Sequence, residues 1–241
     1  MIDLSIIIIN FNSENYLEKC LKSCIRQKTK FKYEIIIVDD ASTDDSYKKI
    51  KHYESKLVKV YKNKKNLGIE KTANYGLKKS KGKYICRVDS DDVLDPKFID
   101  IMIKNFKAKI SFCYSNYKVI NSNGKILSKK YLPNFDKKEI LARGDFLATG
   151  TVYKKDIFDK FGYYNTRHKN CGLENFEFIL NLIFMKRKRG LRINKFLFSL
   201  RKHSKNISKI KKKHIFNYGK KILKKFNLGE YSINQNHPNL I

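Results

Sequence analysis

The amino-acid sequence predicts an α/β fold, with a mostly parallel, twisted sheet, helices on both of its faces and a smaller second half. Two observations lead to this prediction. In residues 1–107, short apolar runs rich in β-branched residues alternate with segments of helical periodicity. Two of these runs end in clustered carboxylates, and open α/β sheets bind ligands at the carboxyl edge of their strands. We therefore expect an α/β protein with a ligand site at that edge.

Composition fits one large domain, or one domain with a subdomain. The chain has 241 residues, and 41% of them are hydrophobic, enough for a sizeable core. Its five cysteines lack metal-binding spacing, so we expect reduced thiols and a cytoplasmic protein. No apolar run approaches the roughly 18 residues of a membrane span. The net charge of +30 favours anionic partners; lysine is abundant throughout, but residues 186–189 and 211–213 are locally dense in cations.

The first half predicts four buried strands. They cover residues 4–9, 33–38, 57–61 and 84–88. Apolar residues at helical spacing predict helices over 16–25 and 69–79. We expect Asn12 or Ser13 to cap the first helix, and Thr43 or Asp44 to cap the helix after the second strand.

The second half mixes strands, a hairpin and helices. Strands are expected at 110–120, 147–153 and 191–200. Helices are expected at 98–106, 137–143, 155–161, 172–185 and 207–226. The pair Asn123-Gly124 predicts a tight hairpin turn after the strand at 110–120.

A cluster of carboxylates follows the fourth predicted strand. Asp89, Asp91 and Asp92 lie within four residues, and Pro96 prevents a central strand from continuing. Clustered carboxylates repel one another, and a hard divalent cation with oxygen ligands relieves that repulsion. On charge alone, the ordinary alternative is a solvated acidic turn that caps the next helix.

A second acidic pair, Asp39 and Asp40, ends the second predicted strand. The residues after it suffice to cap the next helix, so hydrogen bonding to a nucleobase or ribose is the sharper interpretation. The chain has neither a G-x-G-x-x-G motif nor a P-loop. Phosphate groups must then be bound in another way, and a metal ion held by the carboxylate cluster would bind them.

The order and spacing of these landmarks resemble those of the inverting family 2 glycosyltransferases, which have the GT-A fold. The resemblance covers residues 4 to about 208. Within it, Val88-Asp89-Ser90-Asp91-Asp92 resembles the family's D-x-D signature. The other matching stretches are 5–12, 37–44, 66–68, 74–76, 81–85, 150–155 and 161–163.

The resemblance implies a Rossmann-like GT-A domain that transfers a sugar of the hexosyl or N-acetylhexosaminyl type. The expected donor is a nucleotide sugar, foremost a UDP-sugar, and the expected acceptor is a glycan or lipid-linked hydroxyl in surface glycan synthesis. The cofactor would be Mn²⁺ or Mg²⁺. The chain then divides into a nucleotide-sugar-binding half (1–107), an acceptor-side half of the same domain (108–205), and a basic C-terminal helix with its tail (206–241).

The same resemblance assigns roles to single residues. Asp89, Asp91 and His203 are the expected metal site. The histidine lies in a stretch similar to the family's R-x-H loop, and borderline metals such as Mn²⁺ accept imidazole; otherwise a lone histidine in a basic loop is a solvated side chain. The expected donor-binding residues follow the strand ends and the next turns: Asn10, Phe11, Asn12, Asp39, Asp40, Asn66, Gly68, Asn74 and Asp89.

Inversion requires one general base on the acceptor hydroxyl. The family places it second in an acidic pair that opens a helix, and here that pair reads Glu174-Asn175. Since an amide cannot accept the proton, either Glu174 or Glu177 is the base, or the chain is catalytically impaired. A glutamate in the first helical turn can equally serve only to stabilise the helix dipole.

Several alternatives remain open at this stage. The segment 207–226 either lies on an anionic membrane, as a peripheral protein on the inner face of the cell membrane would, or docks on the domain with its basic side in solvent. A nucleotidyltransferase would carry a Gly/Arg/Lys-rich loop after the first strand, which residues 10–13 lack. A basic nucleic-acid or membrane-binding module is a further alternative; no recognisable RNA-binding motif is present, so no specific nucleic acid is expected.

Overall fold

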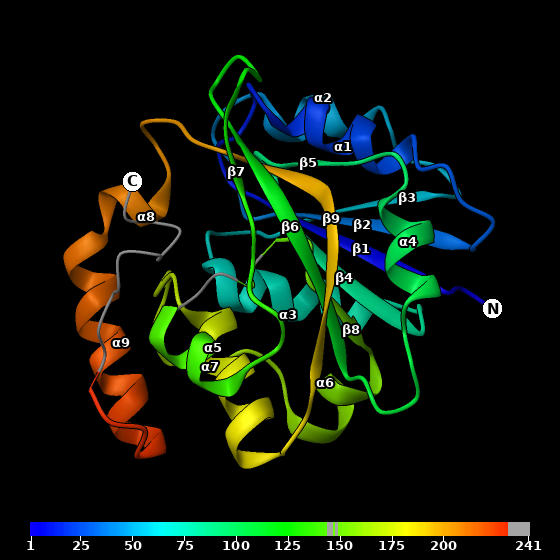
Figure 1. The fold of residues 1–241 in the computed structure, drawn as a ribbon. Coiled ribbons are helices and arrows are strands. Elements are labelled where there is room, and N and C mark those ends of the chain that lie inside the picture. Colours follow the sequence, from blue (N-terminus) through cyan, green and yellow to red (C-terminus); the bar gives the residue numbers. More distant parts are fainter. Residues whose placement is uncertain (144–146, 148, 231–241) are drawn as a thin grey trace.

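The computed structural model describes residues 1–143, 147 and 149–230, and it confirms the α/β fold class (Figure 1). The elements in chain order are β1 (Leu4–Asn10), α1 (Leu17–Ile25), β2 (Tyr33–Asp39), α2 (Ser46–Lys51), β3 (Val58–Lys62), α3 (Ile69–Lys79), β4 (Tyr84–Asp89), β5 (Val93–Leu94), α4 (Phe98–Lys104), β6 (Phe112–Ile120), β7 (Ile126–Lys130), α5 (Lys137–Arg143), β8 (Val152–Lys154), α6 (Asp156–Phe161), α7 (Glu174–Leu180), the π-helical turn η1 (Asn181–Met185), β9 (Gly190–Arg201), α8 (Ile207–Ile210) and α9 (Lys212–Phe226).

The described strands form one sheet in the order β3-β2-β1-β4-β8-β6-β9-β5, with β7 added beside β6. The first four strands of this order are all parallel. Every residue of β1 is buried, which is why this strand is a continuous apolar run rather than an alternating one. The parallel register places Asn10 beside Asp39, and Ile9 beside Asp89. The ends of β1, β2 and β4 therefore meet at one edge of the sheet.

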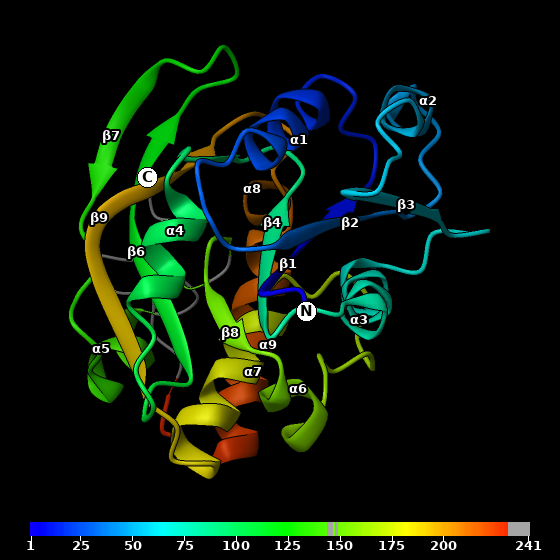
Figure 2. The ribbon, with the colours of Figure 1, turned by 90° about the vertical axis from the view of Figure 1, so that its right-hand side faces the viewer.

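Helices cover both faces of this parallel part. Figure 2 shows α1 and α2 on one side of β1, β2 and β3, and α3 on the other. Gly76 in α3 lies so close to β1 that an added Cβ would be 2.6 Å from Cγ2 of Ile7. A glycine inside this helix is thus explained by close helix–sheet packing.

The second half continues the same sheet with mixed pairing. Strand β8 is antiparallel to both β4 and β6, whereas β9 runs parallel to β6 along its length. The predicted hairpin turn at Asn123-Gly124 joins the antiparallel pair β6 and β7. One large hydrophobic core includes buried residues of both halves, from β1 through to β9.

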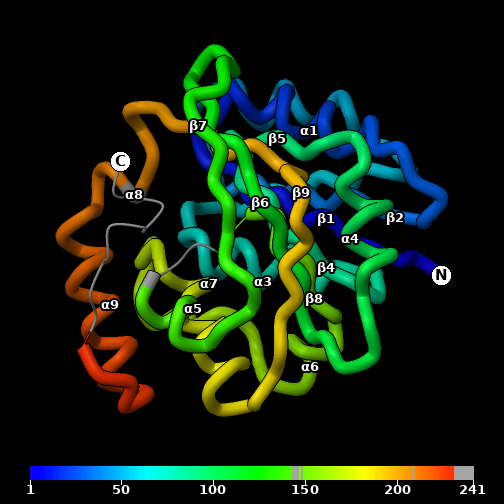
Figure 3. Tube along the Cα trace, in the orientation of Figure 1, coloured from blue at the N-terminus to red at the C-terminus, as the bar shows by residue number. Residues whose placement is uncertain are grey.

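A second, smaller core joins α7 to α9. Phe176 and Leu180 of α7 pack there with Ile215, Ile222 and Leu223 of α9. The trace in Figure 3 shows α9 along one flank of the molecule, beside α5 and α7. The basic C-terminal helix is therefore docked on the domain through its apolar side. No helix among the described residues is long and apolar enough to cross a membrane.

Three predicted elements differ from the structure. The strand expected at 147–153 is only β8, at Val152–Lys154, although residue 148 lies outside the described residues. The single helix expected over 207–226 is two helices, α8 and α9, interrupted at Lys211. The helix expected to run to Met185 leaves α-helical geometry after Leu180 and closes with a π-helical turn.

The predicted side-chain cap of α1 is also wrong. Backbone N–H groups of Tyr16 and Leu17 donate to the carbonyl oxygen of Ser13, and no side chain caps the helix. Asn12 has a left-handed φ of 51°, and its Oδ1 accepts from the backbone N–H of Thr43 instead. These polar side chains tie the loop after β1 to the loop after β2 because the two strands are neighbours.

The cap of α2 is partly as predicted. The Asp44 carboxylate accepts from the backbone N–H of Ser46, the first residue of the helix, at 3.0 Å. Its other oxygen accepts from the backbone N–H of Glu14 at 3.1 Å. Asp44 therefore joins the start of α2 to the loop after β1, and Thr43 makes no such capping contact in the structure.

Candidate functional site

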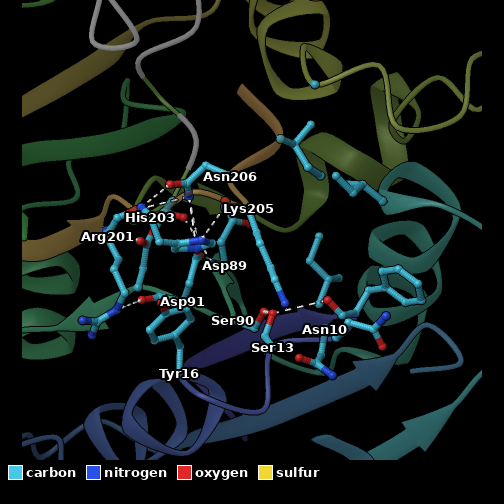
Figure 4. A pocket seen from close by; sticks show the side chains of 18 of the residues that line it. Asn10, Ser13, Tyr16, Asp89, Ser90, Asp91, Arg201, His203, Lys205 and Asn206 are labelled. Carbon is cyan, nitrogen blue, oxygen red and sulfur yellow. Dashed lines mark hydrogen bonds and ion pairs between the residues drawn. The ribbon is translucent and has the colours of Figure 1, made fainter. Parts of the chain in front are cut away.

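A cavity of about 620 Å³ opens at the edge where β1, β2 and β4 end. Its wall is built from both halves of the chain: the ends of β1 and β4, the start of α7, the segment after β9, and α8 with the first turns of α9. Figure 4 shows this cavity from close by, with side chains from these separate segments directed toward one another. Residues far apart in the sequence thus share one site.

Asp91 and His203 meet on the cavity wall. Nε2 of His203 lies 2.9 Å from Oδ2 of Asp91, and both side chains are largely buried. Neighbouring ligands of an octahedral cation, each about 2.1 Å from the metal, lie about 3 Å apart. A carboxylate oxygen and an imidazole nitrogen at this separation therefore fit one divalent cation, and the donor set suits Mn²⁺.

Asp89 lies beside this pair at the tip of β4. Its side chain is 38% exposed, and its Oδ1 forms an ion pair with Nη2 of Arg87 at 3.2 Å. Asp92, the third carboxylate of the cluster, also lines the cavity but is only 3% exposed, and its Oδ1 accepts from the backbone N–H of Arg201. Burial and the charges of Asp91 and Asp89 raise the pKa of Asp92 well above its usual value. All three carboxylates therefore line the cavity, with Asp92 the most deeply buried of them.

The sequence did not reveal the residues that hold the Asp91–His203 pair in place. Nδ2 of Asn206 donates to Oδ2 of Asp91, and Oδ1 of Asn206 accepts from the backbone N–H of His203. The ring of Tyr16 stacks on His203 at 4.8 Å between centroids. Asn206 and Tyr16 belong to no sequence motif, so their role at this site is visible only in the structure.

Arg201 anchors the segment that carries His203. It is 1% exposed, and its guanidinium donates to the carbonyl oxygens of Asp91, Asn121 and Ser122. The same guanidinium lies 5.0 Å from the ring centroid of Tyr16. A buried cation that satisfies three carbonyl groups fixes the end of β9 against the carboxylate turn. His203 follows Arg201 by two residues, and its imidazole therefore lies beside Asp91.

The expected donor-binding residues divide into two groups. Those on the cavity wall are Asn10, Phe11, Asn12, Asp40, Asn66 and Asp89. Those absent from the described cavity wall are Asp39, Gly68 and Asn74. Asp39 is fully buried and accepts from Nδ2 of Asn10 and the backbone N–H of Ser42.

Asp40 organises the loop that precedes α3. Its two carboxylate oxygens accept from the backbone N–H groups of Leu67 and Gly68, both at 2.8 Å. Gly68 has a φ of 92°, and an added Cβ there would lie 2.6 Å from Cγ of Lys169. Glycine is needed at this position for its backbone conformation and for the close approach of another segment.

Asn10 carries an unpaired polar atom on the cavity wall. Its amide nitrogen donates to Asp39 and to Oγ of Ser42, whereas its buried Oδ1 has no hydrogen-bond partner among the described residues. Buried acceptors are nearly always satisfied. An unsatisfied carbonyl oxygen beside Asp40 is thus a candidate acceptor for a ligand's N–H or O–H group.

Glu174 faces the cavity and Asn175 does not. Glu174 is 4% exposed, and its Oε1 accepts from Nη1 of Arg87 at 2.7 Å. Its other oxygen, Oε2, has the Cys171 thiol at 3.9 Å. Asn175 is held in the interior, where its Oδ1 accepts from the hydroxyl of Tyr153. Glu174 is therefore the member of this pair placed to reach a ligand.

Glu177 is directed toward α9 rather than the cavity. Its carboxylate accepts from Lys225, Tyr218 and Asn165. Burial alone would raise the pKa of Glu177, but these three hydrogen bonds lower it below its usual value. The contacts give Glu177 a role in docking the C-terminal helix.

A second group of metal-ligating side chains, Glu70, Cys171 and Glu174, lies nearby, with ligand atoms within 4.8 Å of one another. Its members are already bonded. Glu70 accepts from the backbone N–H groups of Asn170 and Cys171, and Glu174 pairs with Arg87. Burial raises the pKa of the Cys171 thiol, which disfavours the thiolate that a metal needs. This group fits a cation less well than the Asp91–His203 pair.

Comparison with known proteins identifies relatives of the chain. A sequence profile described as glycosyl transferase family 2 matches residues 5–169. One relative is an Escherichia coli protein named UDP-Glc:alpha-D-GlcNAc-diphosphoundecaprenol beta-1,3-glucosyltransferase WfgD. The two sequences are 31% identical over a match that covers 50% of this chain and 47% of the length of WfgD. The chain spans half or less of the curated relatives it matches first.

Solved structures share the fold. S. aureus TarS 1-349, crystallised in complex with UDP-GlcNAc, has a TM-score of 0.70 and 20% identity, covering 98% of this chain and 69% of TarS 1-349. The mannosyltransferase PcManGT of Pyrobaculum calidifontis, in complex with GDP-Man and Mn²⁺, has a TM-score of 0.71 and 13% identity. The match covers 95% of this chain and 65% of PcManGT. At these identities the likeness concerns the architecture.

Proposed function

The chain belongs to glycosyltransferase family 2, and from this premise we propose that it is a metal-dependent, inverting enzyme that transfers a sugar from a nucleotide sugar to a hydroxyl acceptor. One observation carries the proposal: Asp91 of the β4 turn and His203 of the segment after β9 converge, 2.9 Å apart, on a cavity of about 620 Å³. A cavity of this size holds a nucleotide sugar.

Each part of the donor has residues suited to it. Asp89, Asp91 and His203 would hold Mn²⁺ or Mg²⁺, which when bound neutralises the charge that develops on the leaving diphosphate. Asn10 and Asp40 would meet the nucleoside, with the unsatisfied Oδ1 of Asn10 accepting from it. Structural neighbours were crystallised with UDP-GlcNAc or with GDP-Man and Mn²⁺, which supports a nucleotide-sugar donor and a divalent cation. We propose a UDP-sugar as the donor.

Glu174 is the proposed general base. It lines the cavity, Nη1 of Arg87 donates to its Oε1, and the weakly donating Cys171 thiol lies 3.9 Å from Oε2, the oxygen that would accept the proton. In the inverting step, Glu174 takes the proton of the acceptor hydroxyl, the acceptor oxygen bonds to the anomeric carbon, and the bond from that carbon to the diphosphate oxygen breaks. Arg87 is a positioning residue, since it also lies 3.2 Å from Asp89.

A lipid-linked acceptor is supported by the apolar rim of the cavity. Ile207, Ile210 and Ile215 line one side of it, and Ile210 is 66% exposed. Lysines at 209 and 211–213 flank this rim in the sequence. Apolar side chains beside cations suit the interface of an anionic membrane. The related E. coli enzyme is named for a diphosphoundecaprenol-linked sugar. We therefore propose a peripheral enzyme of surface glycan synthesis.

Thermal unfolding with nucleotides tests the donor and metal site. UDP near 100 times its dissociation constant should raise the melting temperature by roughly 5–10 °C when Mn²⁺ is present, and by little without it. Asp91→Asn should abolish the dependence on Mn²⁺. Asp159→Asn is the matched control because it removes an exposed carboxylate on α6 and should leave the shift unchanged. A nucleotide shift that Mn²⁺ does not alter would refute the metal site.

A further inference from the structure

A second cavity, of about 340 Å³, lies at the opposite end of the sheet from the nucleotide site. Lys154 of β8, on its wall, pairs with Tyr84 at the start of β4, whereas Asp89 ends that strand. The two ends of β4 are about 17 Å apart along the strand. Figure 1 shows the surrounding segments, α6 and the turn that leads into β9, at the bottom of the molecule. The second cavity is thus separate from the proposed active site.

The wall of this cavity is strongly cationic. Its cations come from three segments that are distant in the sequence: Lys109, Lys154, Lys160, Arg187, Lys188 and Arg189. Among the described residues that line it, only Asp156 carries negative charge, and its carboxylate forms an ion pair with Lys160 at 2.9 Å. Gathering like charges in a concave site is unfavourable unless an anion compensates them.

Three of these six cations have no partner for their charged groups among the described residues. Lys154 donates to the carbonyl oxygen of Ala108, and the ammonium of Lys188 lies 5.0 Å from the ring centroid of Phe161. The side chains of Lys109, Arg187 and Arg189 make no hydrogen bond or ion pair with any other described residue. Their donors are available to a ligand.

The turn that carries the two arginines is fixed by its backbone. The backbone N–H of Lys188 donates to the carbonyl oxygen of Leu182, and that of Ser111 donates to the carbonyl oxygen of Arg189, at 2.8 and 2.9 Å. Directly after the turn, Gly190 packs so tightly that an added Cβ would lie 2.4 Å from the ring of Phe112. A cationic wall on such a constrained turn is preorganised for a ligand.

We propose that this second cavity binds the phosphate or diphosphate group of an anionic ligand. Arginine guanidinium groups recognise phosphate oxygens in pairs of hydrogen bonds, and lysine adds charge from the opposite wall. The proposal accounts for three of the four cations at 186–189, which do not line the glycosyl-transfer site. Two sources of that chemistry are a soluble phosphorylated molecule and a phospholipid headgroup.

Calorimetric titration with inorganic pyrophosphate tests the proposal. It is done at physiological salt with a chelator, so that no metal brings pyrophosphate to the nucleotide site. Arg187→Gln together with Arg189→Gln should weaken binding at least about ten-fold, because two charge-assisted contacts are lost. Lys28→Gln with Lys30→Gln removes the same charge from exposed positions between α1 and β2, outside both cavities, and should change affinity little.

Co-sedimentation with vesicles of phosphatidylcholine and phosphatidylglycerol distinguishes the two sources. If the arginine variant loses vesicle binding and the control variant does not, the site is assigned to lipid headgroups. If the arginine variant loses pyrophosphate binding but keeps vesicle binding, the site is assigned to a soluble ligand. Equal losses in both double variants, or no binding of either probe by the wild-type chain, would overturn the proposal. Should the arginine variant fail to fold, Lys109→Gln, at an exposed loop position, provides the same comparison.

Discussion

At the scale of single residues, Glu174 and Asn175 show how neighbours in the chain acquire different environments. Glu174 begins α7 on the cavity wall, beside Arg87. Asn175 is turned into the interior, where its amide both accepts from Tyr153 and donates to the carbonyl oxygen of Leu147. An asparagine suits this place because it must donate as well as accept.

We expect Glu174→Gln to lower the rate of transfer by about 10²–10⁴, because a positioned general base contributes that factor. The Mn²⁺-dependent stabilisation by UDP should be retained. The rate is measured as UDP released from UDP-glucose or UDP-N-acetylglucosamine. Glu177→Gln is the control, since Glu177 is directed toward α9. Unchanged turnover in Glu174→Gln would exclude Glu174 as the base.

Asn175→Asp restores the residue type that the family pattern leads one to expect, yet we predict no gain in transfer. A carboxylate cannot donate to the carbonyl oxygen of Leu147, and its charge would be buried. The variant should lose about 1–3 kcal/mol of unfolding free energy, as measured in urea. A clear rise in transfer would show that the side chain at 175 reaches the acceptor.

At the scale of elements, the sequence predicted the strands and helices of the first half closely because these are long, uniformly buried or strongly periodic segments. It predicted the second half less well. The break between α8 and α9 carries no glycine or proline signal, and β8 is set by pairing with β4 and β6 rather than by its own three residues.

The candidate site was predictable only in part, for the same reason. Asp89 and Asp91 stand out as a motif at a strand end, whereas Asn206 and Tyr16 are ordinary residues in the sequence. Their contacts with Asp91 and His203 arise when β9 is placed beside β6 and brings its end to the turn after β4. Tertiary contacts of this kind leave no local signal.

The contact between α7 and α9 predicts how the free energy of unfolding depends on pH. The pKa of Glu177 is lowered in the folded chain, so its contribution to stability is present above the unfolded value of about 4.3 and is lost as pH falls through the folded pKa. Glu177→Gln should therefore cost about 1 kcal/mol near pH 7, since the Lys225 partner is exposed. The difference from wild type should shrink toward pH 3.

Urea unfolding at several pH values measures this difference. Asp159→Asn on α6, which removes an exposed ion pair, should change stability by less than about 0.5 kcal/mol at neutral pH. A cost for Glu177→Gln that stays constant down to pH 3 would mean that the ionised carboxylate does not hold α9.

At the scale of the whole molecule, one continuous sheet joins the two halves of the chain. Residues of both halves line the 620 Å³ cavity. The two sites lie at opposite ends of that sheet, so each can be altered separately. The apolar rim at α8 belongs to the nucleotide-site end, since Ile207 and Ile210 line that cavity.

The proposed membrane contact at α8 can be tested by substitution. Ile210→Ser should weaken binding to anionic vesicles a few-fold, because burial of an isoleucine side chain contributes about 1.5–3 kcal/mol when complete. Flotation with phosphatidylglycerol vesicles measures the effect. Ile126→Ser, at an exposed isoleucine on the β7 hairpin, is the matched control. Equal losses in both variants would argue against a membrane contact at α8.

The distance along the chain between Asp91 and His203, 112 residues, has a consequence for biosynthesis. While the polypeptide is still emerging from the ribosome, the carboxylates of the early strands exist without their imidazole partner. With the proposed metal site incomplete, such a partial product could neither bind a nucleotide sugar nor hydrolyse it. Competence would be acquired late, when the final strand closes against its neighbours.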